Sequence, residues 1–117
     1  MALADLAGED FCYLMTTGRV TGRPHEIEIW FGLAGQTLYM LAGGRDRSDW
    51  VRNIMKQPSV TVRIDNESFS GSGRVVEADT DEDRLARRLL LQKYRSSDDD
   101  LSSWGRTALP VAVDLKV

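Results

Sequence analysis

Two short segments that combine glycine with arginine contain the residues best suited to chemistry. The first, residues 18–23, presents Arg19 and Arg23 from a glycine-bounded turn. The second, residues 43–48, places Arg47 directly before a predicted helix. A guanidinium group binds phosphate or carboxylate through two parallel hydrogen bonds, and the free N–H groups at a helix start add donors. The two segments therefore predict a site for an anionic small molecule, and the alternative is a pair of loops with solvated surface arginines.

Other kinds of site find little support in the sequence. Residues 71–73 begin like a dinucleotide-binding fingerprint, but Val76 stands where the third glycine belongs and a strand follows. Neither a P-loop nor the G-x-S-x-G motif of a nucleophile elbow occurs. We expect the single histidine, His25, at the surface or rim, and Cys12 as a buried, inert thiol. No metal site is expected, and the catalytic residue stays unassigned.

The composition is that of a small globular domain, and we expect one domain over residues 1–117. The 117 residues include 15 basic and 18 acidic side chains, for a formal net charge of −3. A general nucleic-acid-binding protein has a basic excess, so the composition argues against that class. No apolar run reaches the ~20 residues of a membrane span, and the N-terminus lacks the basic segment of a signal peptide. We therefore expect a cytoplasmic protein with a small-molecule partner.

Hydrophobic patterns predict the strands that must position the two arginine segments. Residues 25–31 alternate strictly, with Ile27, Ile29 and Phe31 on one face, which is typical of a half-buried strand. Alternation or β-branched and aromatic runs predict further strands over residues 11–17, 37–42, 59–64, 69–78 and 109–117. The first arginine segment then forms the turn between two strands.

Two helices are predicted between these strands. Ser48 is placed to N-cap a short helix that ends near residue 57. Thr80 and Asp83 resemble a capping box for a helix over residues 81–94, and a polar loop follows it. The second arginine segment therefore leads directly into the shorter helix.

The fold class follows from the short turns between consecutive strands, which make the neighbours antiparallel. About six short antiparallel strands are best satisfied by a closed or nearly closed barrel, because closure removes exposed edges. Two helices are too few to cover both faces of a parallel sheet. Gly71 and Gly73 indicate a bend or bulge in the fifth strand. The prediction is a mainly β (α+β) fold, an antiparallel barrel with two helices.

Two blocks of the sequence, taken together, resemble a known family. Residues 16–24 read TTGRVTGRP, and residues 43–62 contain Gly43-Gly44, Asp49-Trp50, Asn53 and Pro58 in order. These blocks are similar to those of the deazaflavin (coenzyme F420)-dependent nitroreductase and quinone reductase-like proteins. The match runs from about residue 13 to residue 62.

The resemblance implies a split β-barrel related to the pyridoxamine-phosphate-oxidase-like flavin proteins. It also implies coenzyme F420 as the cofactor and hydride transfer to a quinone, enone or nitro acceptor. Carried over by position, the cofactor-binding residues would be Arg19, Thr21, Arg23, Gly43, Gly44, Arg45, Arg47, Ser48, Trp50 and Asn53. Such chemistry needs no side-chain nucleophile, and from residue type alone the proton donor would be solvent, Tyr39 or Tyr94.

Departures from the family pattern leave alternatives open. Val20 stands where many members carry a lysine or arginine, which removes a positive charge from the expected phosphate grip. An FMN-dependent reductase on the same fold and a non-catalytic flavin- or haem-binding protein are the alternatives. Trp50 fits the role of a core anchor of its helix equally well. A barrel this small encloses a large cofactor poorly, so we expect a homodimer.

Overall fold

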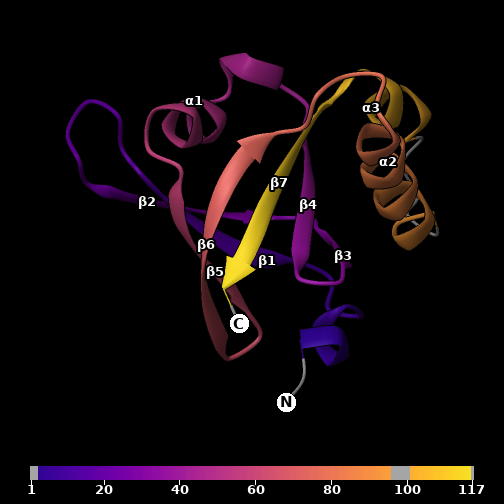
Figure 1. The fold of residues 1–117 in the computed structure, drawn as a ribbon, viewed down its shortest axis with the longest axis horizontal. Coiled ribbons are helices and arrows are strands. Elements are labelled where there is room, and N and C mark those ends of the chain that lie inside the picture. The colour runs from indigo at the N-terminus through magenta and orange to yellow at the C-terminus, as the bar shows by residue number, and fades with distance from the viewer. Residues whose placement is uncertain (1–2, 96–100, 117) are drawn as a thin grey trace.

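The structure, a computed structural model, describes residues 3–95 and 101–116. Residues 1–2, the polar loop predicted after the second helix (96–100) and the last position of the final predicted strand (117) lie outside the described residues. Figure 1 shows the elements, which in chain order are η1 (Leu3–Leu6), β1 (Cys12–Thr17), β2 (Pro24–Ile29), β3 (Gly32–Ala34), β4 (Thr37–Ala42), η2 (Arg45–Arg47), α1 (Asp49–Lys56), β5 (Ser59–Ile64), β6 (Glu67–Val75), α2 (Asp81–Lys93), α3 (Ser102–Thr107) and β7 (Leu109–Lys116).

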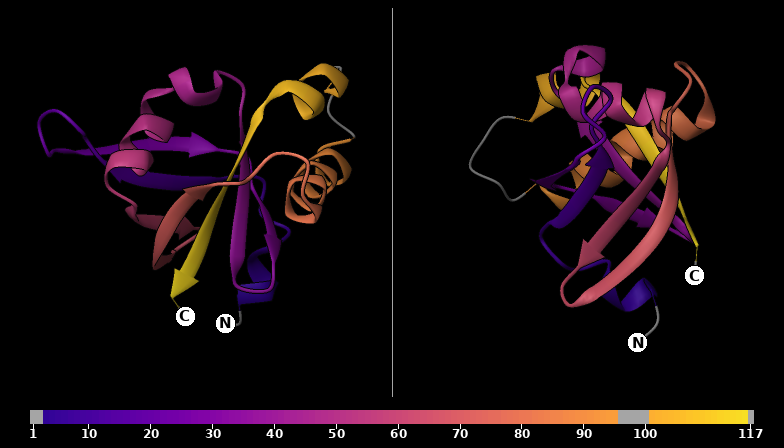
Figure 2. Two further views of the ribbon diagram at one scale, coloured as in Figure 1. Left: turned by 45° about the horizontal axis from the view of Figure 1, so that its top comes forward. Right: turned by 90° about the vertical axis from the view of Figure 1, so that its left-hand side faces the viewer.

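The strands form one antiparallel sheet, and the two views in Figure 2 show that it is curled. The sheet surrounds a hydrophobic core. Their order across the sheet is β2-β1-β5-β6-β7-β4-β3, and every neighbouring pair is antiparallel. The part of the chain that is described contains seven strands and three α-helices. The predicted fold class is therefore confirmed as a mainly β, half-closed barrel consistent with a split barrel.

The strand predicted over residues 25–31 ends earlier than expected. β2 stops at Ile29, and a two-residue bend leads into the short β3. The bend is necessary because β2 pairs with β1 whereas β3 pairs with β4, at the opposite edge of the sheet. In the bend, the N–H of Phe31 donates to Tyr94 Oη (3.1 Å) and its carbonyl accepts from Lys93 Nζ (2.9 Å). The alternating pattern concealed this bend because Phe31 is fully buried, as an inward strand residue would be.

Helix α1 packs closely on the sheet, and two glycines of β6 make room for close contacts, one with α1 and one with β7. Val51 and Ile54 of the helix are buried in the core. A Cβ atom at Gly73 would lie 2.8 Å from Ile54 Cγ2, and one at Gly71 would lie 2.6 Å from Val113 Cγ1. The register between β5 and β6 continues without interruption past Gly71. Of the predicted bend or bulge, the continuous register excludes the bulge, and these glycines mark close packing.

Both predicted helix starts are confirmed in position, but their hydrogen bonds differ. Thr80 Oγ1 accepts a hydrogen bond from the backbone N–H of Asp83 (3.1 Å), as a capping box requires. Ser48 precedes α1 in extended conformation, yet its hydroxyl makes no capping hydrogen bond. A Cβ atom at Gly44 would lie 2.5 Å from Ser48 Oγ, so the hydroxyl is directed toward the preceding loop.

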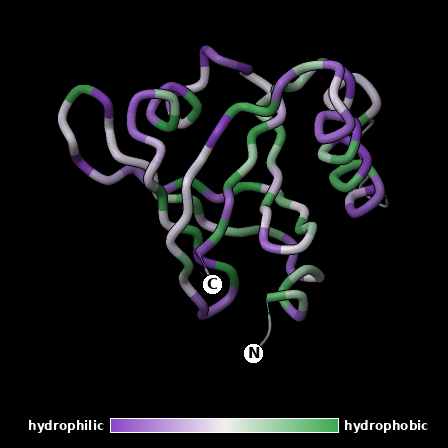
Figure 3. The backbone as a smooth tube through the Cα atoms, in the orientation of Figure 1, coloured by the Kyte–Doolittle hydropathy of each residue, from purple (hydrophilic) through white to green (hydrophobic). Residues whose placement is uncertain are grey.

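Helices α2 and α3 lie together at the side of the sheet formed by β3 and β4 (Figure 1). Ala86 and Leu90 of α2 are fully buried in a second hydrophobic cluster with Tyr39 and Ala112. Hydrophobic and hydrophilic segments alternate along α2 in Figure 3, as in an amphipathic helix. The sequence did not reveal α3, because six residues including Gly105 are too few to show a helical period. Within residues 3–95 and 101–116, no helix has the length and apolarity to cross a bilayer.

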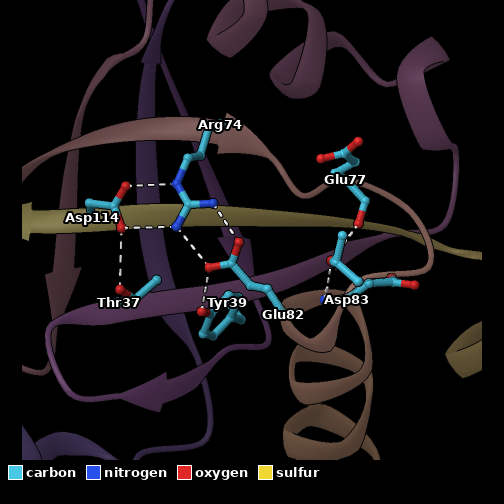
Figure 4. A network of polar contacts seen from close by, with 8 residues as sticks. Thr37, Tyr39, Arg74, Glu77, Glu82, Asp83 and Asp114 are labelled. Carbon is cyan, nitrogen blue, oxygen red and sulfur yellow. Dashed lines mark hydrogen bonds and ion pairs between the residues drawn. The ribbon is translucent and has the colours of Figure 1, made fainter.

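A polar network fastens the start of α2 to β4, β6 and β7 (Figure 4). Arg74 donates to Glu82 (Nη1 to Oε1, 2.6 Å) and to Asp114 (Nε to Oδ2, 2.8 Å). Tyr39 Oη donates to Glu82 Oε2 (2.7 Å), and Thr37 Oγ1 donates to an oxygen of Asp114 (3.2 Å). The hydrogen bonds from Arg74 hold the pKa values of both carboxyl groups below their ordinary values. Burial and then the bond to Glu82 raise the pKa of Tyr39 to about 12.

Candidate cofactor groove

A groove of about 750 Å³ lies between the β1–β2 hairpin and the first turns of α1. Half of the candidate cofactor-binding residues line this groove, namely Arg19, Thr21, Arg23, Trp50 and Asn53. Arg19 and Asn53 are 34 positions apart in the sequence but are joined by hydrogen bonds. The curled sheet therefore brings the first arginine segment against the short helix, which the sequence alone did not require.

The tip of the β1–β2 hairpin, residues 18–23, has a defined backbone shape. The N–H of Gly18 donates to the carbonyl of Arg23 (2.8 Å), and the N–H of Gly22 donates to the carbonyl of Gly18 (2.9 Å). Thr21 Oγ1 accepts from the N–H of Arg23 (3.2 Å). Gly22 has a φ of 75°, a conformation that glycine adopts without steric cost. The hairpin tip thus presents its arginine side chains from a closed turn.

Asn53 anchors this hairpin to α1 from a position that is only 3 % exposed. Its Oδ1 accepts hydrogen bonds from the backbone N–H of Arg19 (3.2 Å) and from Arg19 Nη1 (2.9 Å). Its Nδ2 donates to Thr16 Oγ1 (3.1 Å), and Thr16 is 2 % exposed. Buried polar groups are costly when unpaired, so these three bonds define where the hairpin lies relative to the helix.

Basic and acidic side chains both reach the groove. Arg19 Nη2 forms an ion pair with Asp49 Oδ1 (3.1 Å), and Arg19 Nη1 lies 3.4 Å from the Asp49 carbonyl oxygen. The other two charged groups of the lining are Arg23 and Glu26, both exposed. Within the described residues, no ion pair or side-chain hydrogen bond involves the guanidinium of Arg23. Arg23 is therefore the cation of the groove most available to a ligand.

Trp50 contributes to both the hydrophobic core and the lining of the groove. It is half-buried and packs against the main hydrophobic cluster, and it also forms part of the groove lining. The two roles considered for it from the sequence are therefore compatible. The lone histidine, His25, is exposed and lines the groove beside Gly18, where a Cβ atom would lie 2.8 Å from His25 Nε2.

The second arginine segment lies next to the groove but outside its lining. Arg45 has a φ of 55°, in the left-handed region, and its Nη1 donates to the carbonyl of Thr107. Arg47 is exposed, and the described part of the chain provides no partner for its guanidinium. The structure therefore separates five candidates from the groove residues: Gly43, Gly44, Arg45, Arg47 and Ser48.

A second hollow of about 440 Å³, the aromatic pocket, is lined by Phe11, Glu28, Ile29, Trp30, Leu41, Leu101 and Trp104. The ring of Trp30 stacks on Tyr94 with centroids 4.2 Å apart, and Trp104 meets Trp30 edge-on at 5.8 Å. Sequence reasoning missed this pocket. One signal was present, because Trp30 interrupts the acidic, polar face of the predicted strand over residues 25–31.

The tyrosines considered as proton donors line neither hollow. Tyr94 Oη donates to the carbonyl of Asp10 (2.6 Å), and burial raises the pKa of Tyr94 to about 12. Tyr39 belongs to the network beneath α2. Cys12 is fully buried, and burial raises the pKa of its thiol to about 12, as expected for an inert cysteine. These three groups are held by the fold and not presented to a ligand.

The curled antiparallel sheet with its covering helices places the chain among the split-barrel proteins. The chain belongs to the F420H(2)-dependent quinone reductase family, whose model matches residues 3–116. The family resemblance read from the two sequence blocks is thereby confirmed, and it extends over nearly the whole chain. No curated protein sequence matches this chain.

Solved structures share the fold at low sequence identity. A conserved hypothetical protein from Mycobacterium tuberculosis is 16% identical with a TM-score of 0.79, covering 100% of this chain and 82% of that chain. An F420-H2 dependent reductase is 19% identical with a TM-score of 0.70, covering 89% and 93%. The haem storage protein HutZ from Vibrio cholerae is 14% identical with a TM-score of 0.73, covering 98% and 88%. At such identities the likeness shows the fold alone.

Proposed function

We propose that this protein is an F420-dependent reductase that transfers a hydride from reduced coenzyme F420 to a quinone, enone or nitro acceptor. The observation that carries the proposal is the groove in which Asn53 fastens the Arg19 hairpin to α1. Family membership supports deazaflavin as the cofactor over FMN. The likeness to a haem storage protein concerns the fold and gives no support for haem.

The residues of the groove fit the proposed coenzyme. Its volume of about 750 Å³ lies within the usual range of cofactor and small-molecule sites, about 300–1,000 Å³. Arg23 offers a guanidinium that has no partner among the described residues, and Thr21 offers a hydroxyl. Both suit the phosphate and carboxylate groups of the coenzyme tail. Trp50 adds an apolar wall beside them. The donor set therefore matches an anionic ligand with an apolar portion.

In this proposal the chain binds and orients while the coenzyme, when bound, supplies the hydride. Arg19, held by Asn53, keeps the hairpin against α1, and Arg23 binds the anionic tail. The aromatic pocket would receive the acceptor, because its indole rings favour a planar apolar molecule. The two hollows adjoin along β2, where Ile27 lines the groove and Ile29 lines the aromatic pocket. Two strand positions span about 7 Å, so a ligand of each site would lie near the other.

Titration of the purified protein with F420 and, separately, with FMN tests the cofactor. Quenching of tryptophan fluorescence measures binding, and oxidation of reduced F420 by menadione, an enone or a nitroaromatic measures turnover. Arg23→Gln should weaken F420 binding about ten- to a hundredfold, since a charged hydrogen bond contributes roughly 1.5–3 kcal/mol. Arg88→Gln, an exposed arginine on α2, is the matched control and should bind as the unmodified chain does. Tighter binding of FMN than of F420 would refute the proposal.

We also propose that the protein forms a homodimer through the outward face of β1 and β2. Met15 is 37% exposed on this face, and its register neighbour on β2 is Glu26. On the same face, Arg63 lies on β5, the other neighbour of β1, and Lys116 lies on β7. Two copies related by a twofold axis can therefore pair these basic groups with the acidic ones of β2. Met15→Glu should then yield a monomer by sedimentation, whereas Met55→Glu on α1 should not. A monomeric unmodified chain would contradict this assembly.

A further inference from the structure

Asp49 is an acid placed within the groove that we propose for an anionic cofactor. Its Oδ1 pairs with Arg19 Nη2 at 3.1 Å, and both residues belong to the lining. The Asp49 side chain is 86% exposed, whereas that of Arg19 is 27% exposed. The carboxylate therefore lies on the solvent side of the guanidinium, where a ligand would approach.

The hairpin does not depend on the Asp49 carboxylate for its position. Asn53 Oδ1 already binds both the backbone N–H and Nη1 of Arg19 from a buried site. Nη1 also lies 3.4 Å from the backbone carbonyl of Asp49, which any residue at this position would supply. An ion pair that is this exposed contributes little to stability. The carboxylate is thus not needed to position the hairpin, but it occupies one edge of the Arg19 guanidinium.

The charges of the groove lining also make Asp49 a competitor for an anionic ligand. The lining contains two basic residues, Arg19 and Arg23, and two acidic residues, Asp49 and Glu26, so the formal charges cancel. Of these two acids, Asp49 alone forms an ion pair with an arginine of the lining in the described part of the chain. An incoming phosphate must either displace the carboxylate from Arg19 or bind beside it against electrostatic repulsion.

We propose that Asp49 is a specificity-determining residue that competes internally for Arg19 and limits the affinity of the groove for anions. The inference rests on the proposed function in locating the cofactor in this groove. It assigns Arg19 two states, one paired with Asp49 and one paired with the anionic group of the ligand. Ligands whose anionic group makes two hydrogen bonds to a guanidinium would displace Asp49 best.

Asp49→Asn tests the proposal, since it removes the charge and keeps the size of the side chain. Inorganic pyrophosphate and F420 are the two probes, each measured by calorimetry, with the Trp50 and Arg19 side-chain resonances reporting where the probe binds. Asp49→Asn should tighten pyrophosphate binding three- to tenfold and make it more sensitive to salt. Asp46→Asn is the matched control, because Asp46 is an exposed acid three positions away that lies outside the groove lining.

The outcomes separate this inference from the proposed function. A gain confined to Asp49→Asn supports the competition, even when F420 itself fails to bind, in which case only the proposed function is lost. Equal gains for Asp49→Asn, Asp46→Asn and Glu26→Gln would overturn the inference, because they would reflect net charge alone. No gain with either probe for Asp49→Asn would overturn it as well, whatever the affinity of the unmodified chain for F420.

Discussion

Replacing Asn53 with alanine should destabilise the protein by about 2–4 kcal/mol, because two buried or part-buried partners would lose their bonds. The substitution removes the hydrogen bonds to the Arg19 N–H (3.2 Å), to Arg19 Nη1 (2.9 Å) and to Thr16 Oγ1 (3.1 Å). Arg19 Nη1 can still donate to the Asp49 carbonyl and to solvent, so the loss of its bond to Asn53 contributes little to the destabilisation. The Thr16 hydroxyl, 2 % exposed, and the Arg19 N–H are left without partners, each at roughly 1–3 kcal/mol.

Urea unfolding followed by tryptophan fluorescence measures this loss, and amide hydrogen exchange at Arg19 measures whether the hairpin has come free. Asn66→Ala is the matched control, since Asn66 is the other asparagine of the chain and lies exposed in the turn between β5 and β6. The control should stay within about 0.5 kcal/mol of the unmodified chain. An equally small change for Asn53→Ala, or unaltered exchange at Arg19, would refute the anchoring role.

Three further predictions concern the fold. Leu90→Ala, at a fully buried site on α2, should cost about 2–5 kcal/mol in the free energy of unfolding measured with urea. The lowered pKa values of Glu82 and Asp114 mean that their stabilisation is complete above the pKa of the unfolded carboxyls and disappears as pH falls through the folded values. Glu82→Gln should therefore make the free energy of unfolding, measured with urea at several acidic pH values, depend less on pH. Glu77→Gln should leave that pH dependence unchanged. Cys12 should react with iodoacetamide only under denaturing conditions, and rapid labelling of the folded protein would contradict its burial.

Local patterns predicted most elements because their causes are local. The alternation in residues 59–64 and the Thr80–Asp83 capping pair each act within a few residues, and the structure has both. The bend at residues 30–31 escaped prediction because it depends on which distant strands β2 and β3 join. The aromatic pocket escaped for a similar reason, since Trp30 and Trp104 come from opposite parts of the chain.

The sequence by itself determined the class of fold, the two arginine segments and the family, because periodicity, turn residues and ordered motifs depend on residues close together in the sequence. Only the tertiary structure decided which of those residues meet. It joined the first segment to α1 through Asn53 and left the second, with Arg47, outside the groove. It also showed Arg19 already paired with Asp49. The physical reason is that an ion pair depends on a few ångströms of separation, and the curl of the sheet sets that separation for residues far apart in sequence.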